Sequence, residues 1–371
     1  MIRFDTRPNP SGAPSFLEAK NRRQKVRAAG LHPDYWYPVE KSENLKPGKV
    51  IETKFWGRSI AVYRDHGGKI QAVENRCTHR QLKLSMGEVK GCNLVCMYHG
   101  WEFGCDGKLV SVPHELFGKP FPNIHIAAFP VQERYGLVWI FPGNPAMKDV
   151  HRLPEIPELE GPSPWGVVSI DATWKAHHSM IIDNVCDFTH AYLHRKYKPF
   201  SDAKLTKLEP VGDKVYVSYD TQVGRGRIAG LFVDRKGINT DHMDLCYEYP
   251  FQWSNTDGKI KHHLFVLPID EQTTRGFFLF YFSGLKVPLL NIDIPHKVLQ
   301  RVLDVAKELH IRPLLGEDGV AMEAEQQGYN TYYDEPLAEL NPAVNHFQQL
   351  TIRKWEEYLT ESAHKKVAKV G

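Results

Sequence analysis

The chain has 371 residues, and its 47 Lys and Arg side chains nearly balance 44 Asp and Glu side chains, which leaves a formal net charge of +3. A charge this small gives no support for a nucleic-acid partner or a charged membrane surface. No apolar run approaches the roughly 20 residues that span a bilayer, and the polar start Met1–Asp5 is unlike a signal peptide. The six cysteines lack the spacing of a secreted disulfide framework. We therefore expect a soluble, cytoplasmic protein of about two domains.

The first 45 residues are polar and basic and are broken by prolines, so we expect residues 1–45 to form a packing arm with a short helix within Phe16–Ala29. Short alternating segments separated by glycine turns follow, which is typical of β-strands. The expected strands are Val50–Trp56, Ser59–Tyr63 and Ile70–Glu74, with Tyr135–Phe141 closing this part of the chain.

The stretch from Cys77 to His99 has the most specific pattern in the chain. Cys77 and His79 form a Cys-x-His pair, and after sixteen residues Cys96 and His99 form a Cys-x-x-His pair. Two thiolates and two imidazoles are the ligand set of a Rieske [2Fe–2S] cluster, in which the thiolates hold one iron and the imidazoles the other. Imidazole ligands raise the potential, so such a cluster is a mild one-electron donor. The alternative is a zinc knuckle built from the same four residues.

The residues around this ligand set favour the cluster. Arg80 follows the first pair, Ser85–Gly87 lies between the pairs, and Gly100-Trp101 follows the second. This context resembles the Rieske domain of ring-hydroxylating and related non-haem iron oxygenases. Rieske proteins of cytochrome complexes usually carry a further cysteine after each pair. Leu82 and Gly100-Trp101 stand near those places here, which disfavours that branch.

A proline-rich stretch separates this part from the rest of the chain. We expect an arm over 1–45, a Rieske domain over 46–145, a connector over 146–165 and a catalytic domain over 166–371. Four segments of the last part have the alternation of an antiparallel sheet covered by helices on one face. They are Val215–Tyr219, Leu245–Tyr249, Lys261–Leu267 and Gly276–Phe282. The resemblance implies an α+β protein, in which an all-β Rieske domain precedes a helix-grip catalytic domain.

His190 and His194 lie four residues apart, so on a helix both would face one metal ion. With Asp187 they resemble the mononuclear iron motif of Rieske oxygenases. The resemblance implies a third ligand, an aspartate in a Glu-Asp pair that opens a later helix, and Glu317-Asp318 matches that pair. Two histidines and one carboxylate leave open positions on ferrous iron.

Other side chains compete with Asp318 and with the two histidines as ligands. Spacing alone does not exclude the carboxylates of Glu317, Glu323 and Glu325, and His177 and His178 are competing imidazoles.

The role expected for Asp187 is to bridge two imidazole rings. A carboxylate can accept hydrogen bonds from two imidazoles and so orient a metal ligand. The resemblance implies that Asp187 connects His99 of one subunit to His190 of another, and hence that the protein is a homotrimer. Asn184, three residues earlier, is assigned with Asp187 to the catalytic residues. The alternative is that Asp187 is a helix N-cap.

Further segments have simpler interpretations. Gly224–Gly230 lacks the glycine spacing of a dinucleotide-binding loop, so we expect no flavin or nicotinamide domain. Lys297–His310 has the period of an amphipathic helix, and we expect its apolar stripe to pack in the core. The stripe consists of Val298, Leu299, Val302, Val305 and Leu309. A helix is also expected over Phe347–Tyr358, followed by a frayed basic tail over 365–371.

The resemblance implies a terminal oxygenase. A separate reductase, alone or with a ferredoxin, would pass electrons from NADH or NADPH to the cluster. The bridge through Asp187 would let the cluster supply an electron to Fe(II), where O2 reacts with an apolar or aromatic molecule. Family members catalyse dihydroxylation, monohydroxylation, demethylation or desaturation, and the sequence does not choose among them. Phe188, Tyr192 and Phe282 are candidates for the pocket lining, or else for the core. The alternative function is a Rieske electron carrier whose second domain is a docking module.

Overall fold

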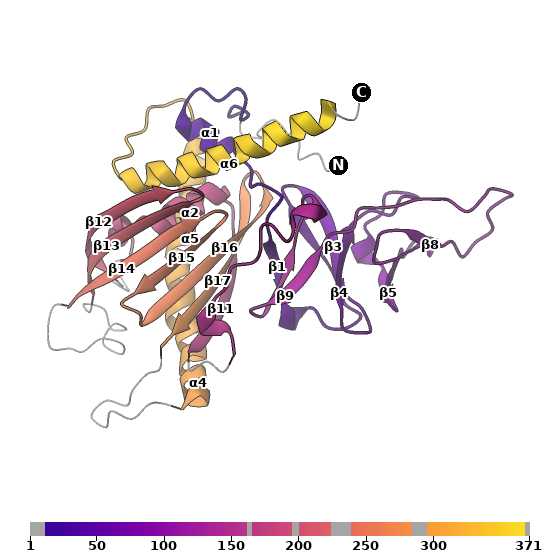
Figure 1. Ribbon diagram of the computed structural model, residues 1–371, viewed down its shortest axis with the longest axis horizontal. Helices are drawn as coiled ribbons and strands as arrows, with labels where there is room; N and C mark the ends of the chain where they lie inside the picture. Colours follow the sequence, from indigo (N-terminus) through magenta and orange to yellow (C-terminus); the bar gives the residue numbers. More distant parts are fainter. Residues whose placement is uncertain (1–11, 162–164, 195–199, 224–238, 284–294, 368–371) are drawn as a thin grey trace. The chain divides into compact units, whose positions relative to one another are not determined.

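The computed structural model describes residues 12–161, 165–194, 200–223, 239–283 and 295–367. The chain forms two compact units (Figure 1). The first comprises chiefly His32–Pro154 with Leu267–Asp270, and the second comprises Thr6–Leu31, Glu155–Val266 and Glu271–Gly371. No helix among the described residues combines the length and the apolar composition that crossing a membrane requires.

The first unit consists of three small antiparallel sheets, joined by 3-10 turns and loops. In spatial order, one sheet contains β1 (Tyr37–Lys41), β10 (Leu137–Ile140) and β9 (Val131–Arg134). The second contains β2 (Val50–Phe55), β3 (Arg58–Arg64) and β4 (Ile70–Glu74). The third contains β5 (Glu88–Lys90), β6 (Asn93–Val95), β7 (Glu102–Phe103) and β8 (Leu109–Ser111). The expected all-β character of this part is confirmed.

The expected strands of this unit agree with the structure to within two residues at each end. β1 pairs with β10, with Tyr37 opposite Ile140. The apolar side chains of β1 are buried, which explains why this stretch joins a sheet. The helix expected through Phe16–Ala29 covers only the second half of that range, as α1 (Arg22–Ala28). It begins there because the Asn21 side chain caps it by accepting a hydrogen bond from the Gln24 N–H. The division after Pro154 falls inside the expected connector.

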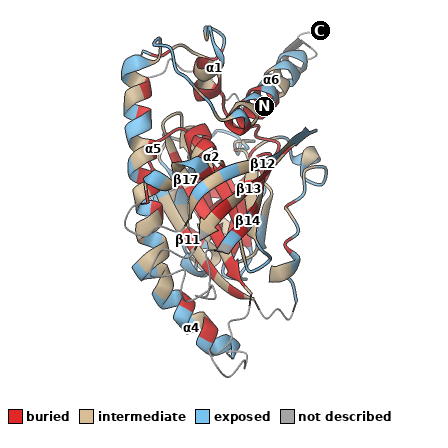
Figure 2. Ribbon diagram, turned by 90° about the vertical axis from the view of Figure 1, so that its left-hand side faces the viewer, coloured by how far each residue is buried: buried red, intermediate tan, exposed pale blue. Residues whose placement is uncertain are grey.

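The second unit is built on a seven-stranded antiparallel sheet with the order β11-β17-β16-β15-β14-β13-β12. The strands are β11 (Gly166–Trp174), β12 (Ser201–Val211), β13 (Lys214–Val223), β14 (Asn239–Glu248), β15 (Phe251–Thr256), β16 (Ile260–Asp270) and β17 (Thr273–Phe282). The main helices are α2 (His178–Cys186), α4 (His296–Ala306), α5 (Arg312–Tyr332) and α6 (Pro342–Val367). The centre of the sheet is buried (Figure 2). The helix expected over Phe347–Tyr358 is part of α6.

Helices cover one face of this sheet, which we call the covered face. Its orientation follows from two contacts. The Tyr247 hydroxyl of β14 lies 3.0 Å from Oγ1 of Thr351 in α6, and a β-carbon added at Gly319 of α5 would lie 2.3 Å from Nε1 of Trp174 in β11. Because side chains alternate along a strand, the register assigns further residues to the same face. They are Val217, Tyr219, Met243, Leu245, Gln252, Ser254, His262, Leu264, Gly276, Phe278 and Phe280.

The helix expected over Lys297–His310 exists, but its apolar stripe does not pack in the core as expected. Leu299 and Leu303 are buried, and Leu303 lies so close to Gly166 that a β-carbon there would be 2.3 Å from Leu303 Cδ1. The rest of the stripe is exposed: Val298, Val302, Val305 and Leu309. The reason is that α4 contacts β11 along one row of side chains four residues apart, so residues beside that row point away.

Two other expectations concern this part of the chain. α4 continues through a π-helical turn, η6 (Lys307–Ile311), into α5, so Glu317-Asp318 lies inside a helix and does not open one. The Gly224–Gly230 segment lies outside the described residues, as does the end of the basic tail.

Candidate metal centres

The two Cys and His pairs of the first unit lie in loops with the same hydrogen-bond pattern. The Cys77 N–H donates to Leu82 O at 2.8 Å, and the Cys96 N–H donates to Trp101 O at 2.9 Å. In each loop the N–H four residues after the cysteine donates to the cysteine carbonyl, and the donor, Gln81 or Gly100, has a φ of +65° or +69°. The two loops thus share one backbone pattern, although the histidine is two residues after Cys77 and three residues after Cys96.

The two thiols are buried in the core of this unit, and the two imidazoles lie next to each other and are partly buried. Cys77 and Cys96 are each 2% exposed, and the rings of His79 and His99 are 4.4 Å apart. Burial raises the pKa of the Cys77 thiol to about 11, and a hydrogen bond with Cys96 contributes. The Nδ1 atom of His79 is buried and has no hydrogen-bond partner. A buried imidazole nitrogen without a partner, two residues after one of the paired thiols, is suited to binding iron.

Trp101 orients one of these imidazoles. Its indole stacks on His79 with ring centroids 4.7 Å apart and an interplanar angle of 6°, and its Nε1–H donates to Nε2 of His114 at 3.0 Å. The sequence gives no signal for His114, because no spacing rule links a residue after β8 to this site, and Trp101 is recognisable there only as part of the Gly100-Trp101 context.

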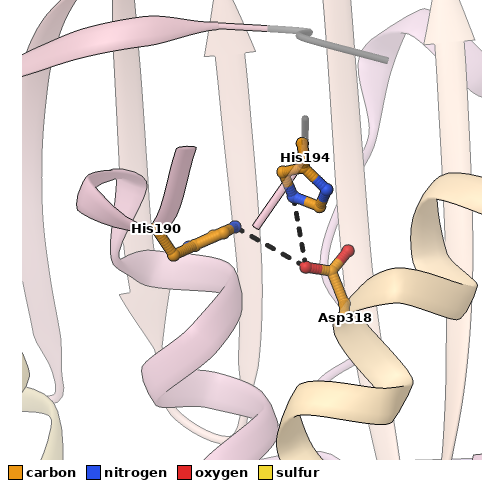
Figure 3. A group of neighbouring side chains, drawn as sticks. All are labelled: His190, His194 and Asp318. Atoms are coloured by element: carbon orange, nitrogen blue, oxygen red, sulfur yellow. Dashed lines mark ion pairs between the residues drawn. The ribbon is translucent and has the colours of Figure 1, made fainter. Parts of the chain in front are cut away.

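In the second unit, His190, His194 and Asp318 point toward one another (Figure 3). Their ligand atoms all lie within 4.8 Å of one another. Oδ1 of Asp318 lies 3.6 Å from Nε2 of His190 and 3.3 Å from Nε2 of His194. The same oxygen is buried and has no hydrogen-bond donor. A buried carboxylate oxygen between two imidazole nitrogens is suited to a cation.

The electrostatics of the two imidazoles differ. Burial, with a contribution from neighbouring His194, lowers the pKa of His190 despite the nearby carboxylates. Burial also acts to lower the pKa of His194, but the carboxylates of Asp318 and Glu317 outweigh it and raise that pKa. The negative charge of Asp318 thus favours a positive charge at this position.

The two histidines do not lie on one regular helix, contrary to the expectation. α2 ends at Cys186, and Asp187 adopts an extended conformation with φ −106° and ψ 97°. A 3-10 helix, η5 (Phe188–Tyr192), follows, and His190 within it is non-helical. The rings of His190 and His194 still come within 5.2 Å, because this turn also returns the chain after four residues.

The competing carboxylates have other partners among the described residues. Glu317 contacts the opposite edge of the His194 ring, with its Oε2 3.0 Å from Nδ1. Glu323 accepts a main-chain hydrogen bond at 2.9 Å just after β11, and Glu325 pairs with Arg27 at 2.7 Å. The competing imidazoles, His177 and His178, also have another partner. The Nε2 atom of each ring lies within 3.1 Å of the carbonyl oxygen of Ala29.

Asp187 caps η5, which is the alternative that the sequence left open. Its Oδ1 accepts hydrogen bonds from the N–H and hydroxyl of Thr189 at 2.9 and 2.7 Å, and from Nδ2 of Asn341 at 2.9 Å. Nδ1 of His190 contacts the main-chain carbonyl oxygen of Asp187, not its carboxylate. The carbonyl thereby fixes the ring so that Nε2 points toward Asp318.

A cavity of about 740 Å³ reaches this group from the α1 side. Its walls include Asn184, Asp187 and His190, so the two residues assigned to catalysis and one candidate ligand lie side by side. The rest of the lining is rich in charged residues. Of the residues considered for an apolar pocket, Phe188 and Phe282 are buried and Tyr192 is exposed.

Comparisons with known proteins agree with both groups. Residues 35–122 match the Rieske [2Fe-2S] domain, and residues 174–362 match the C-terminal domain of the vanillate O-demethylase oxygenase. The chain is 46% identical over 340 residues to the 4beta-methylsterol monooxygenase of Methylococcus capsulatus, which covers 91% of this chain and 92% of the relative. The vanillate O-demethylase oxygenase subunit of a Pseudomonas species is 36% identical over 140 residues, covering 36% of this chain and 40% of the relative.

Solved structures agree on the fold. The crystal structure of dicamba monooxygenase bound to dicamba has a TM-score of 0.71 and 23% identity, and the alignment covers 90% of this chain and 100% of that chain. The matches give no support to the two alternatives left open by the sequence. The Rieske match replaces the zinc knuckle, and the match of the second half to an oxygenase domain replaces the electron carrier. The chain therefore belongs to the Rieske oxygenases, as a terminal oxygenase with a Rieske cluster and a non-haem iron site.

Proposed function

We propose that His190, His194 and Asp318 hold the non-haem iron, and that the two Cys and His pairs of the first unit hold the cluster. The observation that carries the first assignment is the convergence of two Nε2 atoms on the buried Oδ1 of Asp318, which has no hydrogen-bond donor. The second is supported by the buried Nδ1 of His79, which has no partner, and by the hydrogen bond between the thiols of Cys77 and Cys96. The cluster ligands are Cys77, His79, Cys96 and His99.

The chain's own side chains prepare the iron site. Glu317 accepts from Nδ1 of His194, and the carbonyl of Asp187 accepts from Nδ1 of His190, so both rings present the unprotonated Nε2 to a cation. When bound, the cluster supplies single electrons and the iron supplies a redox centre with open coordination positions. The protein then contributes orientation, charge compensation and exclusion of water.

We propose that the reaction is the monooxygenation of a methyl group on a largely apolar, sterol-like molecule. The near full-length similarity to a 4beta-methylsterol monooxygenase supports this choice over dihydroxylation or desaturation. The balance is R–CH3 + O2 + 2 electrons + 2 protons giving R–CH2OH and water. The covered face is apolar, with Leu245, Leu264, Phe278 and Phe280 on it, and α5, which carries Asp318, packs against Trp174 of the same face.

The electrons come from NADH or NADPH through a separate reductase, alone or with a ferredoxin, and the protein works as a cytoplasmic homotrimer. Within the trimer, His99 of one subunit approaches Asp187 of the next. The cavity that exposes Asp187 and Asn184 beside His190 supports this arrangement, because it gives another protein surface access to the iron ligand.

Metal analysis of the purified protein tests the assignment. Each chain is expected to contain about three irons and two acid-labile sulfides, from one cluster and one mononuclear site. His190→Ala is expected to lower this to about two irons and keep both sulfides. Zinc in place of iron, or an iron content that His190→Ala leaves unchanged, would contradict the proposal. Oxidation of a methylsterol with ¹⁸O2 and a reductase, followed by mass spectrometry, tests the substrate.

A further inference from the structure

Three polar residues lie together in the centre of the covered face. Ser254 of β15 stands opposite His262 of β16, and Gln252 stands opposite Leu264 two residues along. Their face is fixed by β14, because Gln252 is also opposite Tyr247, whose hydroxyl contacts α6. These residues therefore lie on the same face as Trp174, which contacts α5 next to Asp318.

The three side chains form a chain of hydrogen bonds centred on His262. Its Nδ1 lies 2.7 Å from Oγ of Ser254, and its Nε2 lies 2.9 Å from Oε1 of Gln252. Since the amide oxygen accepts, Nε2 carries the proton, and Nδ1 accepts from the serine hydroxyl. Burial lowers the pKa of His262 to about 4, so the ring is neutral at physiological pH.

One polar atom of this group has no hydrogen-bond partner. Gln252 is fully buried, and its Nε2 has no hydrogen-bond partner. A buried amide N–H without an acceptor is costly, and native proteins rarely leave one unless water or a ligand satisfies it. The amide can donate two hydrogen bonds here, so what is missing is an oxygen acceptor.

The surroundings of the group are apolar and partly open. The ring of His262 lies 5.2 Å from that of Phe280 and 6.3 Å from that of Phe278. His262 and Phe280 are only partly buried, although both lie on the face that helices cover. The partial exposure of these two rings leaves surface beside the group that a ligand can contact.

The same surface continues to the iron site. Phe278 contacts Trp174 with ring centroids 6.1 Å apart, and the indole of Trp174 lies against Gly319, the residue after Asp318. Two aromatic rings thus link the polar group to the helix that carries the candidate iron ligand. Phe278 and Trp174 are buried, so they link the polar group to α5 by packing, and a molecule beside the group would contact the partly exposed rings of His262 and Phe280.

We propose that Gln252, with Ser254 and His262, binds a hydroxyl or keto oxygen of an otherwise apolar substrate and so determines how that substrate lies beneath the iron. This inference rests on the proposed function and specifies the substrate class of the same site. The group offers a donor but no positive charge, so it selects a neutral oxygen function over a carboxylate. His262 is a positioning residue, because its two hydrogen bonds hold Gln252 and Ser254 in place.

Binding of a matched ligand pair tests the inference. The pair is a methylsterol and the corresponding hydrocarbon in which hydrogen replaces the hydroxyl group, and Kd is measured by equilibrium dialysis with the cluster- and iron-loaded protein. We expect the wild-type protein to bind the sterol at least about tenfold more tightly. Gln252→Leu is expected to remove this preference by weakening sterol binding while hydrocarbon binding is kept.

Two serines provide a matched comparison. Ser254→Ala removes a hydroxyl from the group, whereas Ser218→Ala removes a buried hydroxyl from the other face of the same sheet, where it contacts Asp244 at 2.7 Å. We expect only Ser254→Ala to reduce the preference. Unchanged hydrocarbon binding and iron content show that a variant is folded, and the ligand pair on the wild-type protein decides the matter if Gln252→Leu does not fold.

The outcomes separate this inference from the proposed function. If the wild-type protein oxidises the methyl group but binds both compounds equally, the proposed function stands and the inference is wrong. The inference is also wrong if the preference persists in Gln252→Leu. If the wild-type protein binds neither compound and oxidises neither, the proposed substrate class fails and the inference fails with it.

Discussion

Oε2 of Glu317 lies 3.0 Å from Nδ1 of His194, while Oδ1 of the adjacent Asp318 lies 3.3 Å from Nε2 of the same ring. Two consecutive carboxylates thus hold opposite edges of one imidazole. A hydrogen-bonded carboxylate fixes the tautomer of a metal-ligating histidine and raises its basicity. Glu317, a competing ligand in the sequence, is placed to orient the ligand instead.

Glu317→Gln is therefore expected to weaken iron binding about 10- to 100-fold without removing a ligand. The affinity is measured by competition with a chelator after the mononuclear site has been reloaded with Fe(II). Glu323→Gln is the matched control, because Glu323 is on the same helix and accepts a hydrogen bond from the Lys175 N–H. Equal affinities for the two variants would contradict the orienting role.

Gly319 provides a test of how α5 is seated on the sheet. A β-carbon there would lie 2.3 Å from Nε1 and 2.7 Å from Cδ1 of Trp174, so Gly319→Ala must displace the indole or the helix. We expect a loss of about 1–3 kcal/mol in the free energy of unfolding and a weaker iron site, since Asp318 is adjacent.

Two other glycines of α5 are controls for this substitution. Gly316 and Gly328 have open space where a β-carbon would be added, so alanine there should stabilise the helix by about 1 kcal/mol. Urea denaturation of the loaded protein gives the free energies. Stabilisation by Gly319→Ala would show that the indole does not constrain the helix at this point.

Local patterns gave the sequence predictions that the structure confirms. The expected strand Ile70–Glu74 coincides with β4, because its alternation depends on side chains a few residues apart. The spacing of His190 and His194 placed both near one point although the helix expected there is a 3-10 turn. Short spacing constrains distance even where the type of turn is wrong.

Contacts between residues far apart in the chain could not be predicted from the sequence. The contact of Glu317 with His194 joins residues 123 positions apart, and β1 pairs with β10 across about 100 residues. Neither spacing nor periodicity indicates which carboxylate meets which nitrogen. Periodicity also did not tell which side of α4 meets the sheet. The unpaired amide of Gln252 depends on which acceptors the fold brings near it, and the sequence does not show them.

The capping role of Asp187 makes its proposed part in electron transfer testable without loss of structure. Asp187→Asn keeps Oδ1, which can still accept from Thr189 and Asn341, but it removes the negative charge. We expect both metal centres to remain and the transfer of electrons from the cluster to slow at least about tenfold. Reoxidation of the reduced cluster, followed by its visible absorption in a single turnover, measures this rate.

Thr189→Ala is the comparison for Asp187→Asn. It removes a hydrogen bond to the carboxylate at 2.7 Å but keeps the charge, so it should disturb the cap and leave electron transfer nearly unchanged. If Asp187→Asn transfers electrons at the wild-type rate, the bridging role is wrong and Asp187 is only a cap.

Buried neutral histidines make stability depend on pH, and His263 of β16 isolates one such contribution. Burial, with smaller effects from His262 and Lys261, lowers its pKa from 6.5 to about 3, so its share of stability is complete above pH 6.5 and is lost progressively as the pH falls toward 3. Between pH 7.5 and 5.5 the wild-type protein should lose about 1.4 kcal/mol more than His263→Gln, in which Gln can still accept from the Tyr281 hydroxyl. Urea denaturation at the two pH values measures both losses, and equal losses would show that His263 is not held neutral in the folded protein.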